Sequence, residues 1–509
     1  MRSPMTRLRL GITLFKTMGI GWLASRVLHS VYTRWLACLY EPATSWDPES
    51  RLRSFGGALA DPAEYLQYRR EQAPAFFFSR SEMPGFAAHL RTCDGEERPL
   101  LRRCGEVSDG RMIFFGELQV ETGFPPDWHR NYLSGEKAPA DRHWSRIGDL
   151  EFGDVKGIWE ANRFSMVYSL ARGYARTGDN RLAESFWQLV LDWREHNQPM
   201  QGVNWKSGQE VGFRLMAWVF GLYAFLDSPA TTAQRVYALA EMVLISAGRL
   251  ERSLPYELSQ RNNHGISTAV GLFTVATLFP ELDHSGRSMR RARRLLEREV
   301  RRLVYDDGCF SQHSTNYHRV MLDDYTWAVR LAAVSGRPFS QALLRRIERA
   351  ANLLFQLQDP ATGRVPNFGA NDGALVLPLS SCEFGDYRPA LQAAHYAVTG
   401  RLLYEDGPWN EQLLWLCGAE ALSRDDQKQQ RTDVAASTGG YFGLRLDSDF
   451  AFIHAPPAFM HRPSHADLLH VDVWWRGLNI ALDPGSYSYA DPQAELLAGT
   501  RPHNTVSVD

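Results

Sequence analysis

The 509-residue sequence lacks the patterns that mark several common protein classes. Its six cysteines are scattered without CxxC spacing, which indicates neither a thiolate zinc site nor a disulfide framework. Lysine plus arginine (56) nearly balance aspartate plus glutamate (58), so the usual charge argument for nucleic-acid binding is missing. No HExxH motif occurs, which weakens the case for a zinc peptidase. The chain is 44% hydrophobic and 22% charged, and it is long enough to form two or more globular cores.

The N-terminal segment also lacks a long apolar run. Arg2, Arg7, Arg9 and Lys16 stand among apolar and aromatic residues, as in an export signal, but the uncharged stretch between them covers only 10–15 and no small-x-small cleavage site follows cleanly. A spanning helix would need about 20 apolar residues. The sequence favours an amphipathic helix packed on the domain over an atypical targeting segment or a helix on a membrane surface.

Helical periodicity begins at Ile158 and continues to about Ala421. Before it, 47–150 contains short segments and many turns, so we expect an N-terminal helix and a loop-rich lead-in over 1–150. Gly, Pro and Asn recur where the helices should stop, and short turns between helices favour antiparallel hairpins. The periodic segments are 164–174, 183–193, 211–226, 238–250, 266–279, 295–304, 321–334, 343–357, 391–398 and 413–422.

After a polar stretch at 424–431, the hydrophobic period becomes two. The segments 440–446, 450–454, 469–475 and 478–482 predict strands, so a β domain should begin near residue 437. The chain stops at Asp509 inside what resembles another strand. We therefore expect only the start of a β-sandwich, over 437–509, because these strands are too few for a stable sandwich.

Three candidate metal ligands lie near the C-terminal end: His465, Asp483 and His503. Two imidazoles and one carboxylate are donors that a tetrahedral zinc accepts, with a fourth position for water or a further ligand. Their spacing suits neighbouring strands better than one loop or helix. The alternative is that both histidines cap strands and that Asp483 begins an Asp-Pro-Gly turn.

Two polar clusters stand where buried helices begin. Asn263 and His264 open one apolar helix, and the run from Gln312 to Arg319, which contains Tyr317, precedes another. An amide donates hydrogen bonds without adding charge, and an imidazole titrates near neutral pH, so the clusters suggest acid/base chemistry. The alternatives are a polar helix cap at Asn263 and an ordinary cleft aromatic at Tyr317.

These segments together resemble the heparinase II/III-like family of bacterial polysaccharide lyases, in its exopolysaccharide-associated branch. The resemblance extends from about Pro125 to the last residue. It rests on the order and spacing of WEANR (159–163), GVNW (202–205), NNHG (262–265), NYHR (316–319), NDG (371–373), HAD (465–467), DPG (483–485) and HNTV (503–506). The resemblance implies an α+β multidomain chain: an incomplete α/α toroid over 151–425 that carries the cleft, then an antiparallel β-sandwich that is truncated here. No strict repeat is visible, so the toroid is expected from the resemblance alone.

The resemblance also implies β-elimination on a uronic-acid polymer. In this reaction the C5 proton is removed, negative charge develops on the C6 carboxylate, and the oxygen at C4 leaves. The family assigns Asn263 to the carboxylate, His264 to base or neutraliser, and Tyr317 to base, acid or both in turn. A phenol with a pKa near 10 is a poor base unless positive charge lowers that pKa.

Further roles follow from position in the same motifs. We expect Gln312 and Asn316 to line the cleft, Arg319 to bind the substrate carboxylate, and Trp205 to stack on a sugar ring. The resemblance implies one zinc, structural rather than catalytic, at the ligands His465, Asp483 and His503. This sequence departs from many relatives in two places. Pro463 stands two residues ahead of His465, where relatives have a further histidine nearby, and an active-site aromatic is missing before His503, for which Tyr487 and Tyr489 are candidate substitutes.

Two other functions stay open at this point. A glycoside hydrolase on the same toroid would need two carboxylates facing one bond, and Glu210 and Asp372 are available. A non-catalytic glycan-binding or exopolysaccharide assembly protein would be favoured if Tyr317 and His264 lay far apart. The expected partner is an anionic polysaccharide and not a nucleic acid. Family habit favours the periplasm or cell envelope, the weak leader leaves the cytoplasm open, and the oligomeric state has no signal in the sequence.

Overall fold

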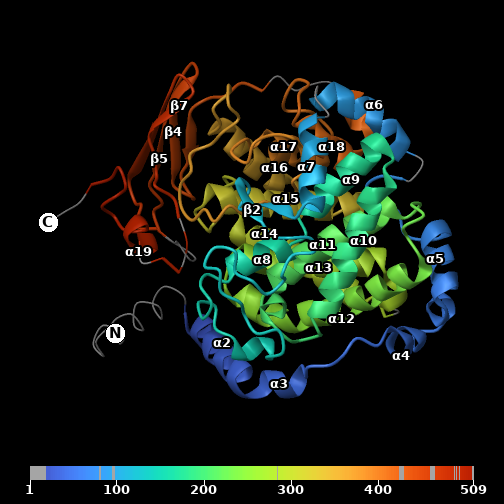
Figure 1. The fold of residues 1–509 in the computed structure, drawn as a ribbon. Helices are drawn as coiled ribbons and strands as arrows, with labels where there is room; N and C mark the ends of the chain where they lie inside the picture. The colour runs from blue at the N-terminus through green and yellow to red at the C-terminus, as the bar shows by residue number, and fades with distance from the viewer. Residues whose placement is uncertain are drawn as a thin grey trace.

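The computed structural model describes residues 19–79, 82–94, 98–283, 285–423, 429–458, 465–486, 488, 490, 491 and 493–506. A large helical body makes up most of the protein, and a β-sheet stands against one side of it (Figure 1). The fold is therefore an α/α toroid followed by an antiparallel sheet, as expected. The linker residues 424–428, Pro463, Tyr487 and Tyr489 lie outside the described residues, as does the N-terminal segment through residue 18.

All of the predicted helical segments contain helices, and all but the last of these helices are longer than their apolar pattern; in the segment 413–422, α18 ends at Cys417 and a 3₁₀ turn (Ala419–Ser423) follows. Apolar periodicity marks only the buried turns, whereas the helices begin at polar caps such as Asp179, Thr232, Asn262, Ser314 and Ser340. The helices of this body are α8 (Lys156–Asn162), α9 (Met166–Thr177), α10 (Asn180–His196), α11 (Gly208–Phe225), α12 (Ala233–Ser259), α13 (Asn263–Leu278), α14 (Arg287–Leu303), α15 (Thr315–Val334), α16 (Gln341–Gln356), α17 (Arg388–Thr399) and α18 (Asn410–Cys417).

Three helices at the centre run parallel to one another. A Cβ atom added at Gly208 of α11 would lie 2.8 Å from Thr268 of α13, and one added at Gly271 would lie 2.8 Å from the Cα of Gly212, so α11 and α13 touch through their backbones. Hydrogen bonds from Ser267 to Asp324 (2.6 Å) and from Trp327 to Thr274 (2.9 Å) join α13 to α15 in the same direction. The N-terminal ends of α11, α13 and α15 therefore lie at the same end of the body.

The lead-in before residue 150 is more helical than predicted. It contains α2 (Ile20–Val31), a π-helix (Tyr32–Leu36), α3 (Ala37–Tyr40), α4 (Pro48–Arg53), α5 (Pro62–Glu71), α6 (Met83–Asp94) and α7 (Arg98–Ser108), then a hairpin of β1 (Arg111–Phe114) and β2 (Leu118–Glu121). The prediction of a loop-rich segment was wrong because most of these helices are short or irregular in their apolar pattern, although α7 buries Leu100, Cys104 and Val107 on one face. Helix α5 buries Arg69 with Tyr65, and α6 begins at a Met-Pro-Gly sequence that is typical of a turn.

Helix α2 packs on α12 through stacked rings of His29 and Tyr256, whose centroids are 3.4 Å apart. Its outer face and the residues that follow expose large apolar side chains, including Ile20, Leu28 and Leu39. None of the helices in the described part of the chain is both long enough and apolar enough to cross a lipid bilayer.

The sheet contains five antiparallel strands in sequence order. The four predicted strands are β4 (Tyr441–Leu446), β5 (Asp449–His454), β6 (His470–Trp475) and β7 (Leu478–Ala481), and the short β3 (Val434–Ala436) adds an edge. Phe450, Phe452 and Trp474 on the inner face pack with Leu357 and Phe368 of the helical body. This shared core fixes the sheet against the loop that leads to the site.

Candidate active site

Asn263 and His264 occupy the first turn of α13, where Asn262 caps the helix by accepting a hydrogen bond from the His264 amide (3.1 Å). Asn263 is fully buried, and its side-chain amide donates to Gln209 of α11. The backbone amide of Asn263 donates to the side chain of Gln312 (3.1 Å). The structure thus places the Gln312 side chain next to Asn263.

His264 has a carboxylate partner that the sequence analysis missed. Its Nδ1 lies 3.1 Å from Oε2 of Glu257, at the end of α12, and Glu257 also accepts from the Gly208 amide (2.7 Å). Burial acts to raise the pKa of Glu257, but the His264 imidazole outweighs burial and holds this pKa below its usual value. The His264 side chain keeps 25% of its surface exposed. A buried carboxylate on Nδ1 fixes the ring and leaves Nε2 to meet a substrate.

Tyr317 lies in the first turn of α15, and its hydroxyl donates to Oδ2 of Asp372 (2.6 Å). The same oxygen forms an ion pair with Lys156 of α8, and both side chains are largely buried. Burial acts to raise the pKa of Asp372, but the Lys156 and Arg163 cations outweigh burial and hold this pKa well below its usual range. The Tyr317 hydroxyl is therefore a proton donor held by an anionic acceptor.

A buried arginine connects these groups. Arg163 donates from Nε and Nη2 to both oxygens of Glu210 (2.7 and 2.9 Å) and pairs with Glu160. Burial acts to raise the pKa of Glu210, but the Arg163 cation outweighs burial and holds this pKa below its usual value. At Glu160 burial is the larger effect, and it raises the pKa to about 7. Gln209 donates to Glu210 (3.2 Å) and accepts from Asn263, so one network reaches from Asn263 to Arg163.

This arrangement does not suit the two carboxylates considered for glycoside hydrolysis. A hydrolase acid needs a raised pKa and an open face toward the bond. Glu210 and Asp372 both have lowered pKa values, and cations or donors occupy both of them.

Two predicted substrate-binding residues are structural in this fold. Arg319 is buried between the rings of Phe384 and Tyr387, with its guanidinium carbon 4.2 and 4.3 Å from their centroids. Its guanidinium also donates to Asn316 (2.9 Å), which is fully buried as well. The prediction that Arg319 binds the substrate carboxylate was wrong, because the segment around residue 384 covers it.

Trp205 also lies in the core, packed against Trp46 and Trp193 with centroid separations of 6.1 and 5.8 Å. A fully buried indole has no face for a sugar ring. The preceding Gly-Val-Asn sequence indicated a surface turn, but this short helical turn is covered by the lead-in, which the sequence analysis interpreted as loops.

The three predicted metal ligands come together beside the sheet. Nδ1 of His465 lies 3.6 Å and Nε2 of His503 lies 3.2 Å from the two oxygens of Asp483, and all three side chains are buried. Candidate donor atoms of the three residues lie within 4.8 Å of one another. Although burial would raise it, the two imidazoles hold the pKa of Asp483 well below its usual range.

The donor atoms fit a metal ion. His465 Nδ1 and His503 Nε2 are buried nitrogens that make no hydrogen bond within the described residues. The opposite nitrogens are already used, with His465 Nε2 at Ser486 Oγ (3.1 Å) and His503 Nδ1 at the Gly499 carbonyl oxygen (2.6 Å). Such partners fix the rings of metal-binding histidines. Two orphaned nitrogens and an ionised carboxylate are the donors that a divalent cation takes.

The same carboxylate reaches the helical body. Oδ2 of Asp483 accepts a hydrogen bond from the Gly369 amide (3.2 Å). Two hydrogen bonds join the neighbours of Gly369 to the start of α15. The Thr315 amide donates to the Phe368 carbonyl (3.2 Å), and the Ser314 hydroxyl donates to the Ala370 carbonyl (2.5 Å). The candidate metal site therefore contacts the loop that carries Asp372.

A second link joins the sheet to the body near this loop. His454 of β5 lies 3.1 Å from Nδ1 of His313 and 3.4 Å from Oδ2 of Asp467, and all three residues are buried. The sequence analysis interpreted neither His313 nor His454, because no motif marks a contact across 141 residues.

Comparisons with known proteins agree with this fold and its motifs. A family model described as the heparinase II/III N-terminus matches 127–377, and one described as heparinase II/III-like, C-terminal, matches 428–509. The chain belongs to the heparinase II/III-like family. The hairpin β1–β2 and helix α7 precede the region that these family models match.

Two curated relatives are heparin-sulfate lyases. That of Bacteroides stercoris is 21% identical over 418 residues, which are 75% of this chain and 58% of the relative. That of Pedobacter heparinus is 23% identical over 464 residues, which are 87% of this chain and 62% of the relative. The chain thus spans about three-fifths of the length of these relatives.

Solved structures share the fold. A crystal structure of heparinase III superposes with a TM-score of 0.62 at 16% identity, covering 93% of this chain and 71% of that one. A heparan sulfate lyase from Pedobacter heparinus superposes with a TM-score of 0.51 at 19% identity, covering 91% and 67%. At these identities the likeness establishes the heparinase fold, which explains why a toroid forms without a visible sequence repeat.

Proposed function

We propose that the protein is a polysaccharide lyase that cleaves an anionic, uronic-acid-containing polymer by β-elimination and leaves an unsaturated uronate. The observation that carries this proposal is the pairing of two proton-transfer groups at one end of the central helices. His264 is backed by the Glu257 carboxylate, and Tyr317 is held by Asp372. Asn263 lies next to His264 and supplies an uncharged amide.

The two proton-transfer groups have different states, which suggests their roles. Tyr317 donates to an ionised carboxylate, so it is a neutral phenol and suits the acid that protonates the leaving oxygen at C4. His264 has a free Nε2 and a carboxylate on Nδ1, so it suits the base that takes the C5 proton. The C5–H and C4–O bonds break, and the electron pair from C5 forms the C4–C5 double bond.

The negative charge that develops on the C6 carboxylate needs donors. The N-terminal ends of α11 and α13 direct their dipoles to this place, and the amide of Asn263, which is fully buried in the first turn of α13, would donate to the carboxylate once the substrate is seated. The Lys156 ammonium would stabilise the Tyr317 phenolate that remains after proton transfer. The sequence analysis left Tyr317 as acid, base or both, and this geometry favours acid.

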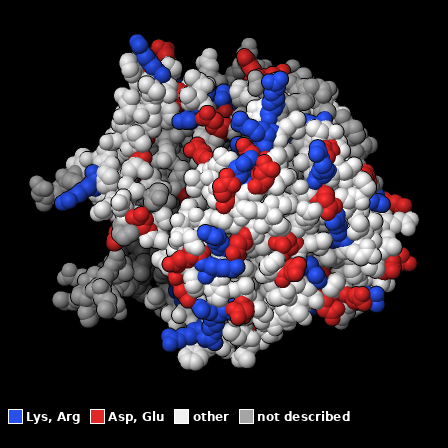
Figure 2. All heavy atoms as spheres, viewed as in Figure 1, with Lys and Arg blue, Asp and Glu red and all other residues white. Residues whose placement is uncertain are grey.

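The substrate class follows from the relatives and from local charge. The relatives are named heparin-sulfate lyases, and we propose an anionic polysaccharide of the same broad kind, including an exopolysaccharide of the producing cell. Figure 2 shows basic and acidic side chains intermingled over the face in view. Recognition of a polyanion would then depend on a few placed cations rather than on a broad basic surface.

We propose zinc as the ion at His465, Asp483 and His503, since two imidazoles and one carboxylate are a common zinc donor set. When bound, it would fix the loop at Gly369 through Asp483 and would have a structural role. Metal analysis of the purified protein tests this assignment, and a different stoichiometric ion would replace zinc.

We also propose a location in the periplasm or cell envelope, with the exposed apolar side chains of α2 and α3 on a membrane surface. Sedimentation with vesicles of anionic and neutral lipids tests this contact, using Leu28→Ser and Leu39→Ser together as the variant. Equal sedimentation of variant and wild type would contradict it.

The test of the lyase proposal compares wild type with Tyr317→Phe on a panel of uronate polymers. Ultraviolet absorbance of the unsaturated uronate should rise with wild type and fall by about 100-fold or more in rate with the variant, because general acid–base groups contribute that much. Tyr325→Phe is the control, because it removes a hydroxyl from the same helix. That hydroxyl donates to the Leu296 carbonyl (3.0 Å) and not to a site residue.

Each other result points to one of the alternatives. New reducing ends without an unsaturated product would move the assignment to hydrolysis. Retained binding of polymer with neither product would favour a glycan-binding or assembly protein. An absorbance rise that is equal in wild type and Tyr317→Phe would remove Tyr317 from the mechanism.

A further inference from the structure

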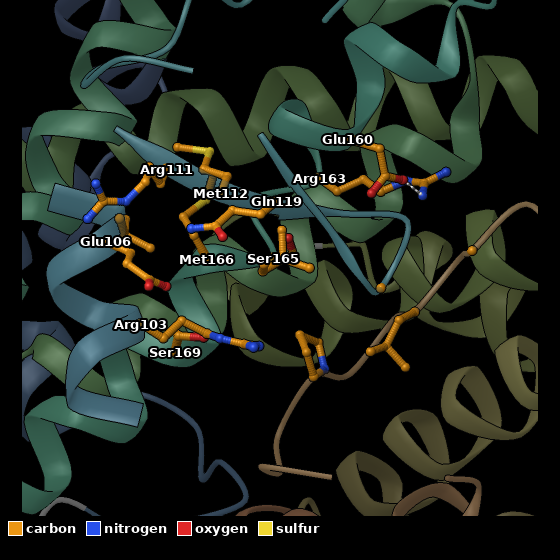
Figure 3. A pocket seen from close by; sticks show the side chains of 16 residues that line it. Arg103, Glu106, Arg111, Met112, Gln119, Glu160, Arg163, Ser165, Met166 and Ser169 are labelled. Atoms are coloured by element: carbon orange, nitrogen blue, oxygen red, sulfur yellow. Dashed lines mark hydrogen bonds and ion pairs between the residues drawn. The ribbon is translucent and has the colours of Figure 1, made fainter. Parts of the chain in front are cut away.

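A pocket adjoins the Glu160–Arg163 pair (Figure 3). Its walls come from α7, the β1–β2 hairpin, the start of α9 and 373–378. Arg163 lines this pocket and also holds Glu210 in the network that reaches Asn263. Gly373, another lining residue, directly follows Asp372, the partner of Tyr317. The pocket and the candidate active site therefore share one wall.

Close packing fixes the hairpin that forms one side of the pocket. The Phe115 amide donates to Glu160 (2.7 Å). A Cβ atom at Gly116 would lie 2.2 Å from the Phe384 ring, and one at Gly373, where φ is +71°, would lie 2.5 Å from Phe115. These contacts leave no room for larger side chains, so the pocket is largely formed before a ligand arrives.

The cations around the pocket differ in their partners. Arg111 is paired with Asp109 (2.9 Å) and Arg102 with Glu106 (3.7 Å). Arg103 makes no hydrogen bond or ion pair with any other residue in the described ranges. Desolvation at the pocket, and then repulsion by Arg172, lowers the pKa of the Arg103 guanidinium, whereas the nearby Glu106 opposes this shift, and the residue as a whole remains exposed. An anion beside Arg103 would compensate both effects.

Neutral hydrogen-bonding groups line the pocket with this arginine, together with the Glu106 and Glu160 carboxylates. Figure 3 shows Arg103, Gln119 and Ser165 reaching toward the pocket from α7, β2 and the turn before α9. The amide of Gln119 and the hydroxyls of Ser165 and Ser169 are donors that carry no charge. One unpaired guanidinium with several neutral donors is an arrangement that suits a carboxylate or a sulfate.

We propose that this pocket binds a carboxylate or sulfate group of a sugar residue outside the cleaved bond, with Arg103 as its charged partner and Gln119 and Ser165 as neutral donors. The proposal rests on the lyase function proposed above, and it names a determinant of which polymers are accepted. Arg103 and Gln119 precede the residues that the family model matches, 127–377.

The test measures binding in the Tyr317→Phe protein, which should hold substrate without turning it over. Titration calorimetry compares unsulfated and sulfated uronate oligosaccharides with a neutral oligosaccharide. Arg103→Gln should weaken binding of an anionic oligosaccharide about tenfold, the effect expected for one charged hydrogen bond. Arg102→Gln, on the same helix but already paired, should change binding less than about twofold. The oligosaccharide that shows the difference identifies carboxylate or sulfate as the ligand.

Several results would overturn the pocket. Equal effects of Arg103→Gln and Arg102→Gln, an equal loss for the neutral oligosaccharide, or no binding of any anionic oligosaccharide would each do so. Gln119→Ala provides a second variant, with circular dichroism as the check of folding. Binding that depends on Arg103 in a protein whose wild type forms no unsaturated uronate would refute the lyase but keep the pocket. Formation of unsaturated uronate at the same rate in wild type and Arg103→Gln would refute the pocket but keep the lyase.

Discussion

Replacing Asp372 by asparagine tests how the buried charges support Tyr317. The carboxylate accepts from the Tyr317 hydroxyl at 2.6 Å and pairs with Lys156, and the exposed fractions of the Asp372 and Lys156 side chains are 9% and 15%. Asparagine keeps the shape and one oxygen acceptor but removes the charge. The phenol then loses its anionic partner, and the Lys156 ammonium loses its counterion.

The expected magnitude follows from this burial. Removing one partner of a buried ion pair costs about 3–5 kcal/mol, because the other charge stays desolvated. Lys156 retains some contact with water, so we expect the lower end, about 3 kcal/mol, for Asp372→Asn. Adding Lys156→Met removes the stranded charge and should recover most of that free energy of unfolding. The rate should not recover, since the carboxylate that holds the Tyr317 hydroxyl in place is still missing.

Urea denaturation at pH 7 measures the stability of the wild type, both single variants and the double variant. Initial rates of unsaturated uronate formation measure their activity under the same conditions. Asp386→Asn is the control, because Asp386 pairs with Arg388 (2.7 Å) away from Tyr317. If activity returned together with stability in the double variant, Asp372 would have only a structural role. If Asp372→Asn matched wild type in both measurements, the charge network would be irrelevant.

Four further predictions concern the carboxylates and the metal. Glu257→Gln should lower kcat by about 100-fold or more with little change in KM, because the ring of His264 loses its orienting charge, whereas Glu251→Gln on the same helix should not. Burial raises the pKa of Glu160 to about 7, so the free energy of unfolding should fall by at most about 3 kcal/mol as pH rises from about 4.5 to 7. Urea denaturation at several pH values measures this fall, and Glu160→Gln should abolish it. Glu210→Gln should instead destabilise the protein at pH 7, since Arg163 lowers the pKa of Glu210 and its charge stabilises the fold above the unfolded pKa. Chelation should lower the Tm and the rate together, and added zinc should restore both; a chelated, metal-free protein with an unchanged Tm would contradict a structural ion.

The sequence predicted what depends on local pattern. Apolar periodicity located the helices of the body, and alternation located β4, β5, β6 and β7. Asn263 and Tyr317 were proposed as site residues because a polar residue in the first turn of a buried helix breaks that pattern, and the family resemblance supplied their roles. His465, Asp483 and His503 were found because imidazoles and a carboxylate with strand-like spacing are a donor set.

The sequence did not predict what depends on contacts between distant segments. Lys156 meets Asp372 across 216 residues, and Glu257 meets His264 only after α12 turns into α13. The same limit caused the errors. Arg319 and Trp205 have side chains that suit sugar binding, and only the fold places the Phe384 segment over one and the lead-in over the other.

Asp372 is the residue at which these separate parts meet. Its loop is held on one side by Ser314 and Thr315 at the start of α15, and on the other by Asp483 of the candidate metal site. The helix that supplies Tyr317 therefore also holds the loop that supplies the hydrogen-bond acceptor of its hydroxyl. An ion that fixes Asp483 would limit the movement of that acceptor without touching the substrate. A bound ion would in this way connect the sheet to the hydrogen-bond partner of Tyr317 at the helix ends.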